Sequence, residues 1–211
     1  MGVYRDQVLP RLYDRICGAP SIGRWRARAV DGLGGRVVEI GFGSGLNVEH
    51  YPSGVDSVLA VEPAEVAWRL ASPRVAACGV PVEHAGTDGQ SLQIVSGSCD
   101  AALSTFTLCT IPDPVAALVE IYRVLRPGGT LHFLEHGLSP DSDVAGWQRR
   151  FEGLHRRLAG GCHLTRDAPA LVRVAGFRLE HCEQGYATGP RPWSYLTVGV
   201  GRKAGVGREA G

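Results

Sequence analysis

The sequence predicts an α/β protein in which a mainly parallel β-sheet is covered by helices on both faces. Two patterns predict this class. Short apolar runs that are typical of buried strands alternate with stretches of helical spacing along most of the 211 residues. A glycine-rich loop directly follows the first of these runs, as in sheets that bind a ligand at the carboxyl ends of their strands. At roughly 100 to 200 residues per domain, the length fits one full domain.

Two helices are expected before the sheet. Residues 4–16 and 22–32 have helical spacing, and Gly18-Ala19-Pro20 separates them. Ser21 is the expected N-cap of the second helix. We expect residues 1–35 to cover the ligand site, with the main domain following them.

Seven strands and four further helices are expected in the rest of the chain. The strands are predicted at 36–40, 57–62, 80–84, 100–105, 130–135, 177–183 and 194–200, the last two as an antiparallel pair. The helices are predicted at 64–71, 114–125, 143–158 and 166–175. Pro63 ends the second strand, and residues 126–129 form a turn into the fifth. The domain is thus expected to span 36–202, followed by a disordered, glycine-rich tail at 203–211.

Composition excludes several classes of function. Lys and Arg number 22 against 21 Asp and Glu, so the chain has no electrostatic signature of nucleic-acid binding. The sequence has no run of 18 apolar residues and no apolar secretion signal, which predicts no integral membrane segment and a cytoplasmic location. The six cysteines are scattered without a C-x-x-C pair or metal-ligand spacing. We therefore expect free thiols in a reducing compartment and no metal.

The most informative segment is the glycine-rich loop, which has the form Glu39-x-Gly41-x-Gly43-x-Gly45. A dinucleotide fingerprint has the spacing G-x-G-x-x-G, and Leu46 stands here in the place of its third glycine. Glu39 lies inside an apolar run, where an unpaired carboxylate is costly, so we expect it to order the loop or to face a cationic ligand group. The pattern favours a nucleoside-containing ligand other than a dinucleotide.

A second acid supports a nucleoside site. Glu62 ends the second strand, 17 residues after Gly45, close to the position where an acid accepts hydrogen bonds from ribose hydroxyls. Its other interpretation is an exposed acid at a helix N-terminus. Asp88-Gly89-Gln90 follows the third strand, where it could contact adenine or form an ordinary turn. Thr105 and Phe106, after the fourth strand, are expected along the pocket floor.

The E-x-G-x-G-x-G form resembles motif I of the class I S-adenosylmethionine-dependent methyltransferases. Further segments resemble one branch, the small thiol S-methyltransferase-like proteins of the methyltransferase-11 group. They are Leu46-Asn47, Tyr51-Pro52, Leu108-Cys109, Arg123 to Gly129, Phe133-x-Glu135-His136 and Gly161-Cys162-x-Leu164-Thr165-Arg166. The resemblance covers about residues 36–200, but the membrane-anchoring segment of the animal members is not among the matched residues.

This resemblance implies a Rossmann-like seven-stranded sheet in the order 3-2-1-4-5-7-6. It also implies S-adenosyl-L-methionine as the cofactor and S-adenosyl-L-homocysteine as the product. Combined with the patterns above, it gives a set of expected cofactor-binding residues: Glu39, Gly41, Gly43, Gly45, Asn47, Glu62, Pro63, Asp88, Gly89, Gln90, Thr105 and Phe106.

The resemblance ranks a small apolar thiol first among acceptors. Methyl transfer from a sulfonium is an in-line displacement that needs aligned reactants and little water, and a thiol needs only a modest push toward thiolate. His136 and His163 are the candidate bases, although each could be a structural imidazole. The expected acceptor-pocket residues are Tyr13, Cys109, Glu135, Cys162 and Arg166, although buried cysteines are often simple core residues.

Other functions stay open at this point. Within the same enzyme class, the acceptor could be an amine or phenolic oxygen of a lipid, quinone or other metabolite. Outside it, the chain could be a nicotinamide-dependent oxidoreductase, which the glycine spacing disfavours, or a cofactor-binding subunit without catalysis. A monomer or a homodimer is expected.

Overall fold

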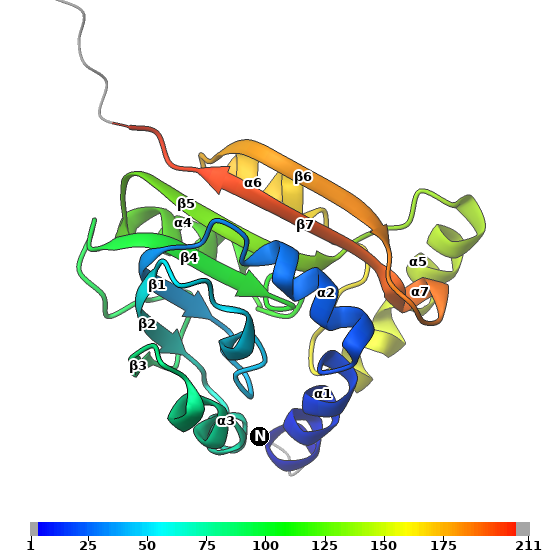
Figure 1. Cartoon of the computed structure of the whole chain (residues 1–211). Coiled ribbons are helices and arrows are strands. Elements are labelled where there is room, and N and C mark those ends of the chain that lie inside the picture. Colours follow the sequence, from blue (N-terminus) through cyan, green and yellow to red (C-terminus); the bar gives the residue numbers. More distant parts are fainter. Residues whose placement is uncertain (1–3, 206–211) are drawn as a thin grey trace, which may run out of the picture.

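The computed structural model describes residues 4–205 and contains one seven-stranded sheet in the order β3-β2-β1-β4-β5-β7-β6 (Figure 1). Six strands run in the same direction, and β7 (Tyr195–Arg202) runs antiparallel to its two neighbours, β5 and β6. The six are β1 (Gly35–Ile40), β2 (Val55–Val61), β3 (Val82–Gly86), β4 (Cys99–Thr105), β5 (Leu125–His136) and β6 (Arg178–Tyr186). The predicted fold class and strand order are confirmed.

The central strands are continuous apolar runs because helices bury both faces of the sheet. On one face, Val37 and Leu103 belong to a core cluster with Ala71 of α3 (Glu65–Ala77) and with Val30 and Leu33, which follow α2 (Pro20–Ala29). On the other face, Val38 and Ala102 pack with α4 (Pro114–Val124) and α6 (Ala168–Val174). The predicted two-sided covering is therefore present.

The remaining helices surround the carboxyl ends of the strands. They are α1 (Leu9–Cys17), preceded by a π-helical turn (Tyr4–Val8), the 3-10 turn Val48–His50, α5 (Ser142–Leu158) and α7 (Arg191–Ser194). An ion pair of 2.9 Å between Arg74 and Asp14 links α1 to α3. The Tyr4 hydroxyl donates to the carbonyl oxygen of Leu158 at the end of α5 (2.8 Å). In Figure 1, α1 thus lies between α3 and the projecting α5–α7 region.

Several predicted boundaries are wrong for identifiable reasons. Helix α2 begins with Pro20 after Ala19, so Ser21 is not its N-cap; proline suits the first helical position because its φ is already helical. Helix α3 starts after Pro63, continues through Pro73 and ends at Ala77. The predicted turn at 126–129 is a bulge inside β5, since Leu125 already pairs with Cys99.

The predicted disordered tail is also partly wrong. The Lys203 ammonium donates to the carbonyl oxygens of Tyr122 and Leu125, both at 2.6 Å, and its backbone N–H donates to Gly129. Lys203 is therefore fixed against the end of α4. Residues 206–211 of the predicted tail, like residues 1–3 of the predicted N-terminal cover, lie outside the described residues.

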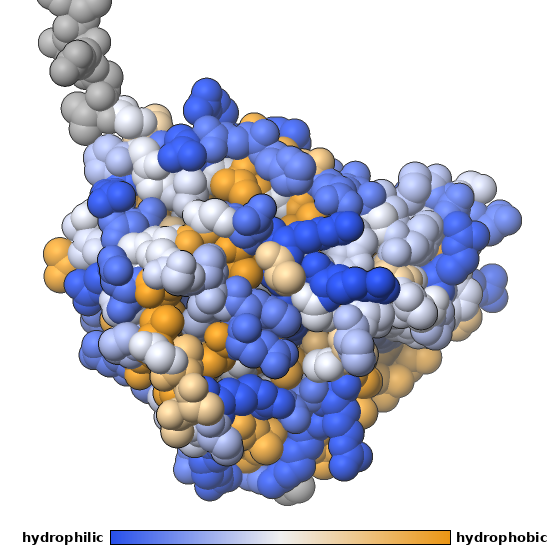
Figure 2. Space-filling model, viewed as in Figure 1, coloured by the Kyte–Doolittle hydropathy of each residue, from blue (hydrophilic) through white to orange (hydrophobic). Residues whose placement is uncertain are grey.

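An apolar surface occupies the region between α1 and α5. The exposed side chains of Val8, Leu12 and Ile16 recur every four residues, and Leu154 and Leu158 of α5 are exposed as well. Figure 2 shows apolar surface at the lower right, where Figure 1 places these two helices. Among residues 4–205, no helix is both long and apolar enough to cross a bilayer.

Candidate active site

The candidate site is at the carboxyl ends of four neighbouring strands. The glycine loop follows β1, Glu62 follows β2, Thr105 ends β4 and His136 ends β5. In open α/β sheets, ligands bind outside these ends, where the strand order reverses. Here the reversal falls between β1 and β4, so the predicted residues converge on the position that the topology favours.

The glycine loop requires glycine for two different reasons. Gly41, Gly43 and Gly45 have φ values of 66°, 59° and 74°, in the left-handed region that other residues rarely adopt. A Cβ on Gly41 would lie 1.9 Å from Thr107 Oγ1, so the β4–α4 loop leaves no room there. A Cβ on Gly43 would meet only the carbonyl oxygen of Gly41, at 3.8 Å, which leaves this side of the loop open to a ligand.

Glu62 connects the loop to β2. Its carboxylate is 7% exposed and accepts hydrogen bonds from the backbone N–H groups of Gly43 and Ala64, each at 2.7 Å. Burial raises the pKa of Glu62, and the two N–H donors oppose that shift. Each carboxylate oxygen has two lone-pair sites, so each retains one for a hydroxyl donor. These two free acceptor sites fit the ribose hydroxyls of an adenosyl group.

A buried polar network lies beneath the loop. Glu39 has no exposed surface and accepts hydrogen bonds from Asn47 Nδ2 (2.8 Å) and the Tyr51 hydroxyl. Asn47 also donates to Thr105 Oγ1 (2.9 Å), and Arg26 donates to Asn47 Oδ1 (2.7 Å) and Thr105 Oγ1 (3.0 Å). Burial raises the pKa of Glu39 to about 7. Glu39 and Asn47 therefore fix the loop from below.

Arg26 and Tyr51 were not among the predicted site residues. Arg26 is one of three arginines in α2, with Arg24 and Arg28 at alternate positions, and no local feature of the sequence marks the one that is buried. Tyr51 follows the glycine loop. Its hydroxyl is only 12 residues from Glu39, and this short separation from a buried acid was the sequence signal that could have marked it as a site residue.

Phe106 carries the backbone strain of the site. It is the one non-glycine residue in the described part of the chain with a positive φ, 55°. Its N–H is held by Leu134 O (2.8 Å), and its ring centroid is 5.0 Å from that of His136 and 5.4 Å from the Arg26 guanidinium carbon. Strained residues persist where surrounding contacts fix them, and they cluster at functional sites.

The segment after β3 forms a turn at the side of the site. The exposed Asp88 accepts from the N–H of Gln90 (2.8 Å), and the Gln90 side chain accepts from the N–H of Asp113 (2.8 Å). A Cβ on Gly89 would be 3.3 Å from Ile111. These contacts match the ordinary-turn interpretation, and the adenine contact stays a prediction. Pro63 is exposed beside Glu62.

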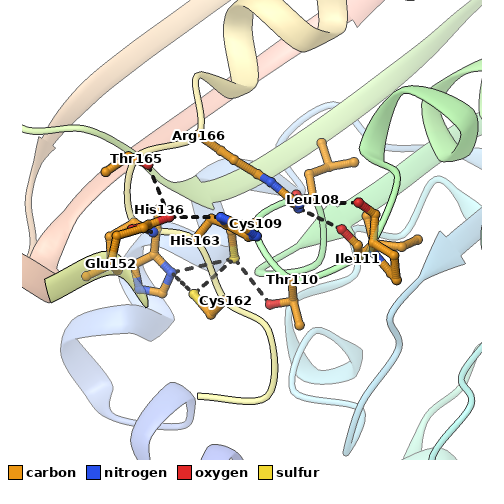
Figure 3. A network of polar contacts seen from close by, with 12 residues as sticks. Leu108, Cys109, Thr110, Ile111, His136, Glu152, Cys162, His163, Thr165 and Arg166 are labelled. Atoms are coloured by element: carbon orange, nitrogen blue, oxygen red, sulfur yellow. Dashed lines mark hydrogen bonds and ion pairs between the residues drawn. The ribbon is translucent and has the colours of Figure 1, made fainter. Parts of the chain in front are cut away.

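Two thiols and an imidazole meet beyond Phe106. The distance between the sulfur atoms of Cys109 and Cys162 is 3.6 Å, and His136 Nδ1 lies 3.7 Å and 3.6 Å from them, as Figure 3 shows. Cys109 and Cys162 are 1% and 5% exposed, and Phe106 and Trp147 pack beside them. This thiol–imidazole cluster places three soft polar atoms among apolar side chains.

The surroundings of the cluster affect its protonation. Burial alone would lower the pKa of His136, but its contact with Cys109, nearby negative groups and a hydrogen bond with the backbone of Trp193 raise it. The hydrogen bond with Cys162 and burial raise the pKa of the Cys109 thiol. Without a bound ligand, Cys109 therefore favours its neutral thiol form.

Glu135 and Arg166 are placed differently from their predicted pocket role. Glu135 has no exposed surface, and its carboxylate accepts from Ser104 Oγ and from the backbone N–H groups of residues 107–109 at 2.9–3.1 Å. Arg166 donates to the carbonyl oxygens of Leu108 (2.6 Å) and Ile111 (2.7 Å). Both side chains therefore position the loop that carries Cys109.

The structure places His163 and Tyr13, the other two predicted residues, in different surroundings. His163 Nδ1 is 2.8 Å from Glu152 Oε1 of α5, and Thr165 donates to the same oxygen. This pairing directs Nδ1 of the ring toward α5. The Tyr13 hydroxyl of α1 is buried without a hydrogen-bond partner, and Cys162 and Cys109 both raise its pKa after burial itself. Tyr13 therefore belongs to the cluster's surroundings.

Comparison with known proteins identifies the family. A model described as a methyltransferase domain matches residues 38–133. Thiol S-methyltransferase TMT1B of Homo sapiens is 32% identical over 180 residues, which cover 82% of this chain and 71% of that protein. Demethylmenaquinone methyltransferase of Thermus thermophilus is 32% identical over 140 residues, which cover 62% of this chain and 63% of that protein.

The chain belongs to the S-adenosylmethionine-dependent methyltransferases. This confirms the predicted family and, with it, the cofactor. The fold agrees: a methyltransferase of Thermotoga maritima, described as a possible histamine N-methyltransferase, superposes with a TM-score of 0.69 at 23% identity, over 95% of this chain and 98% of that one. This methyltransferase spans 66% of the length of TMT1B from Rattus norvegicus and 71% of the human protein.

Proposed function

We propose that this methyltransferase transfers a methyl group to the sulfur of a small apolar thiol. The observation that carries the proposal is the thiol–imidazole cluster, which is buried among apolar side chains next to Phe106. The names of the TMT1B relatives, thiol S-methyltransferases, support the same acceptor. A cytoplasmic location is also proposed, and it is supported by the six free cysteines.

Bound S-adenosylmethionine supplies an electrophilic methyl group on a sulfonium. Glu62 and the open side of Gly43 would hold its nucleoside, and the buried Glu39–Asn47 pair keeps the loop in place. Phe106 and Trp147 exclude water from the acceptor, which favours displacement between aligned reactants. His136 Nδ1 lies where it can favour the thiolate form of the acceptor. In this proposal α1, with Tyr13, covers the pocket.

A quinol or phenol is the second candidate acceptor. Trp147 packs against Phe151 and Trp193, each with a ring-centroid distance of 4.7 Å, and these rings offer an aromatic surface beside the cluster. A relative named demethylmenaquinone methyltransferase supports this alternative.

Transfer of labelled methyl to a panel of acceptors tests the proposal. The panel contains an alkyl thiol, hydrogen sulfide, a phenol, a quinol, an amine and a phospholipid. Turnover on the thiols alone is the expected result. Turnover on the quinol or lipid alone would refute the thiol assignment, and calorimetric binding of NAD in place of S-adenosylmethionine would refute the cofactor assignment. Cofactor binding without turnover on any member would favour a non-catalytic subunit.

A further inference from the structure

The three donor atoms of the thiol–imidazole cluster have the spacing of metal ligands. In a tetrahedral zinc site with Zn–S of about 2.3 Å and Zn–N of about 2.0–2.1 Å, two sulfur ligands are about 3.8 Å apart and a sulfur and a nitrogen about 3.6 Å. The corresponding distances here are 3.6 Å between the sulfurs and 3.7 Å and 3.6 Å from sulfur to His136 Nδ1. All three pairs therefore agree to within about 0.2 Å with one tetrahedral centre.

We propose that Cys109, Cys162 and His136 bind one zinc ion through two sulfurs and Nδ1. The three residues come from separate segments: the loop after β4, the end of β5 and the loop after α5. Two thiolates and an imidazole are the donor set that zinc prefers over hard cations such as magnesium. The spacing of these residues along the chain, 27 and 26 positions, resembles no linear metal motif, which explains the sequence-based expectation of no metal.

Neighbouring groups hold each ligand in a position suited to a metal. The Glu135 carboxylate accepts from the backbone N–H of Cys109 (3.1 Å), and the backbone N–H of His163 donates to the carbonyl oxygen of Cys109 (2.7 Å), which joins the two cysteine loops. The His136 ring packs against the Phe106 ring, with 5.0 Å between the ring centroids, while Nδ1 faces the sulfurs. Such second contacts fix the orientation of metal-binding histidines.

The charge of a zinc centre would also be balanced at this position. A divalent ion with two thiolates is neutral, and one further anionic ligand would leave a single negative charge. The Arg166 guanidinium, held by the carbonyl oxygens of Leu108 and Ile111, stands beside the loop of Cys109 and can offset that charge (Figure 3). Metal binding would displace the protons of both thiols.

Three protein ligands leave one tetrahedral position open, as in catalytic zinc sites. The orphaned Tyr13 hydroxyl lies beside the same turn, since a Cβ on Gly160 would be 3.8 Å from it, and it can donate to a ligand bound there. If the proposed function holds, the open position takes the acceptor sulfur, and the metal, which occupies Nδ1, takes over from His136 the role of favouring the thiolate. The thiol loses its proton to solvent, the sulfur forms a bond to the methyl carbon, and the sulfonium bond to that carbon breaks. The products are a thioether and S-adenosylhomocysteine, without oxidation or reduction.

The metal site can be tested without measuring methyl transfer. Reduced, metal-free protein is titrated with Zn²⁺ and, as a spectroscopic probe, Co²⁺, and metal content is measured by mass spectrometry after desalting. About one ion per chain and the absorption of a tetrahedral Co²⁺–thiolate centre are expected. The double variant Cys109→Ser/Cys162→Ser should lose both, whereas Cys182→Ser, which changes an exposed cysteine, should keep both. Circular dichroism checks that each variant is folded.

Two results would overturn the site. One is a wild-type protein that binds no stoichiometric metal, a result that needs no variant. The other is unchanged binding in the folded double variant. The role of the open position has its own readout: an alkyl thiol added to the Co²⁺ form without cofactor should shift the charge-transfer band. An unchanged band, or full thiol methylation by metal-free enzyme, would refute that role while leaving the proposed function standing.

Discussion

At the scale of single residues, the glycine loop depends on both backbone conformation and space. Gly41 and Gly97 have the same φ, 66°, but only Gly41 faces a neighbour, because a Cβ on Gly97 would meet nothing within 4 Å. The two positions therefore separate the cost of a positive φ from the cost of overlap with Thr107.

We predict that Gly41→Ala lowers the free energy of unfolding by more than Gly97→Ala does. The positive φ costs each variant about 1–2 kcal/mol, and forced repacking adds about 1–3 kcal/mol at Gly41. Urea denaturation of both variants measures the difference. Equal losses would show that the loop after β4 moves aside at no cost.

Glu62 provides the test of the cofactor site at the same scale. Glu62→Gln keeps the shape of the side chain but replaces one acceptor oxygen with a donor, so it should weaken binding of S-adenosylmethionine by about 1–3 kcal/mol. Isothermal titration calorimetry measures the affinity. Glu65→Gln, at an exposed position in the first turn of α3, is the matched control and should bind normally. Normal affinity in Glu62→Gln would remove Glu62 from the cofactor site.

At the scale of elements, β7 is packed tightly between its neighbours. A Cβ on Gly199 would lie 2.6 Å from Phe133 Cζ of β5 and 2.7 Å from the carbonyl oxygen of His181 of β6. Because the contact with His181 is with the backbone, rotation of the Phe133 side chain could not relieve both overlaps. The absence of a side chain at Gly199 thus lets the Phe133 ring cross the strand.

Gly199→Ala should therefore destabilise the protein by about 1–3 kcal/mol. Gly146→Ala is its counterpart in α5, where a Cβ meets nothing within 4 Å and alanine is the better helix former, so a gain of up to about 1 kcal/mol is expected. Thermal unfolding of the two variants should show shifts of opposite sign. A neutral Gly199→Ala would contradict the close packing of β7.

Elements were easier to predict than the contacts between them. Continuous apolar runs marked the parallel strands, and turn residues placed most boundaries within a few positions. The role of Arg26 could not be predicted. Cys109, Cys162 and His136 were each expected at the site, but their contact with one another could not be predicted, because it depends on segments that meet only in the folded chain. The same limit applies to Glu135 and Arg166, which were expected in the pocket and instead hold its loop by backbone hydrogen bonds.

At the scale of the whole molecule, the buried network couples stability to pH. Glu39 is buried among Asn47, Tyr51 and Arg26, and the network joins β1, β4 and α2. Its pKa is about 7 in the folded protein, against 4.5 for a solvent-exposed glutamate. The folded state therefore holds the proton more tightly than the unfolded state. The resulting stability is complete below pH 4.5 and is lost as pH rises through 7.

Glu39→Gln should remove this dependence. Because glutamine is neutral throughout, the variant should gain stability relative to the wild type as pH rises from 5 to 8, by up to about 3 kcal/mol. Urea denaturation at pH 5, 6, 7 and 8 gives the difference at each step. For Glu65→Gln, an exposed control, the difference should stay constant. A constant difference for Glu39→Gln would mean that the carboxylate stays charged in the fold.

The position of β7 also affects how the protein emerges from the ribosome. Among the described strands, β7 is the last to be synthesised, yet it lies between β5 and β6. Until residues 195–202 have left the exit tunnel, β5 has an open edge and β6 has no place in the sheet. Open strand edges pair readily with other chains. The nascent protein is therefore most exposed to aggregation during the final part of its synthesis, after most of its core residues are already available.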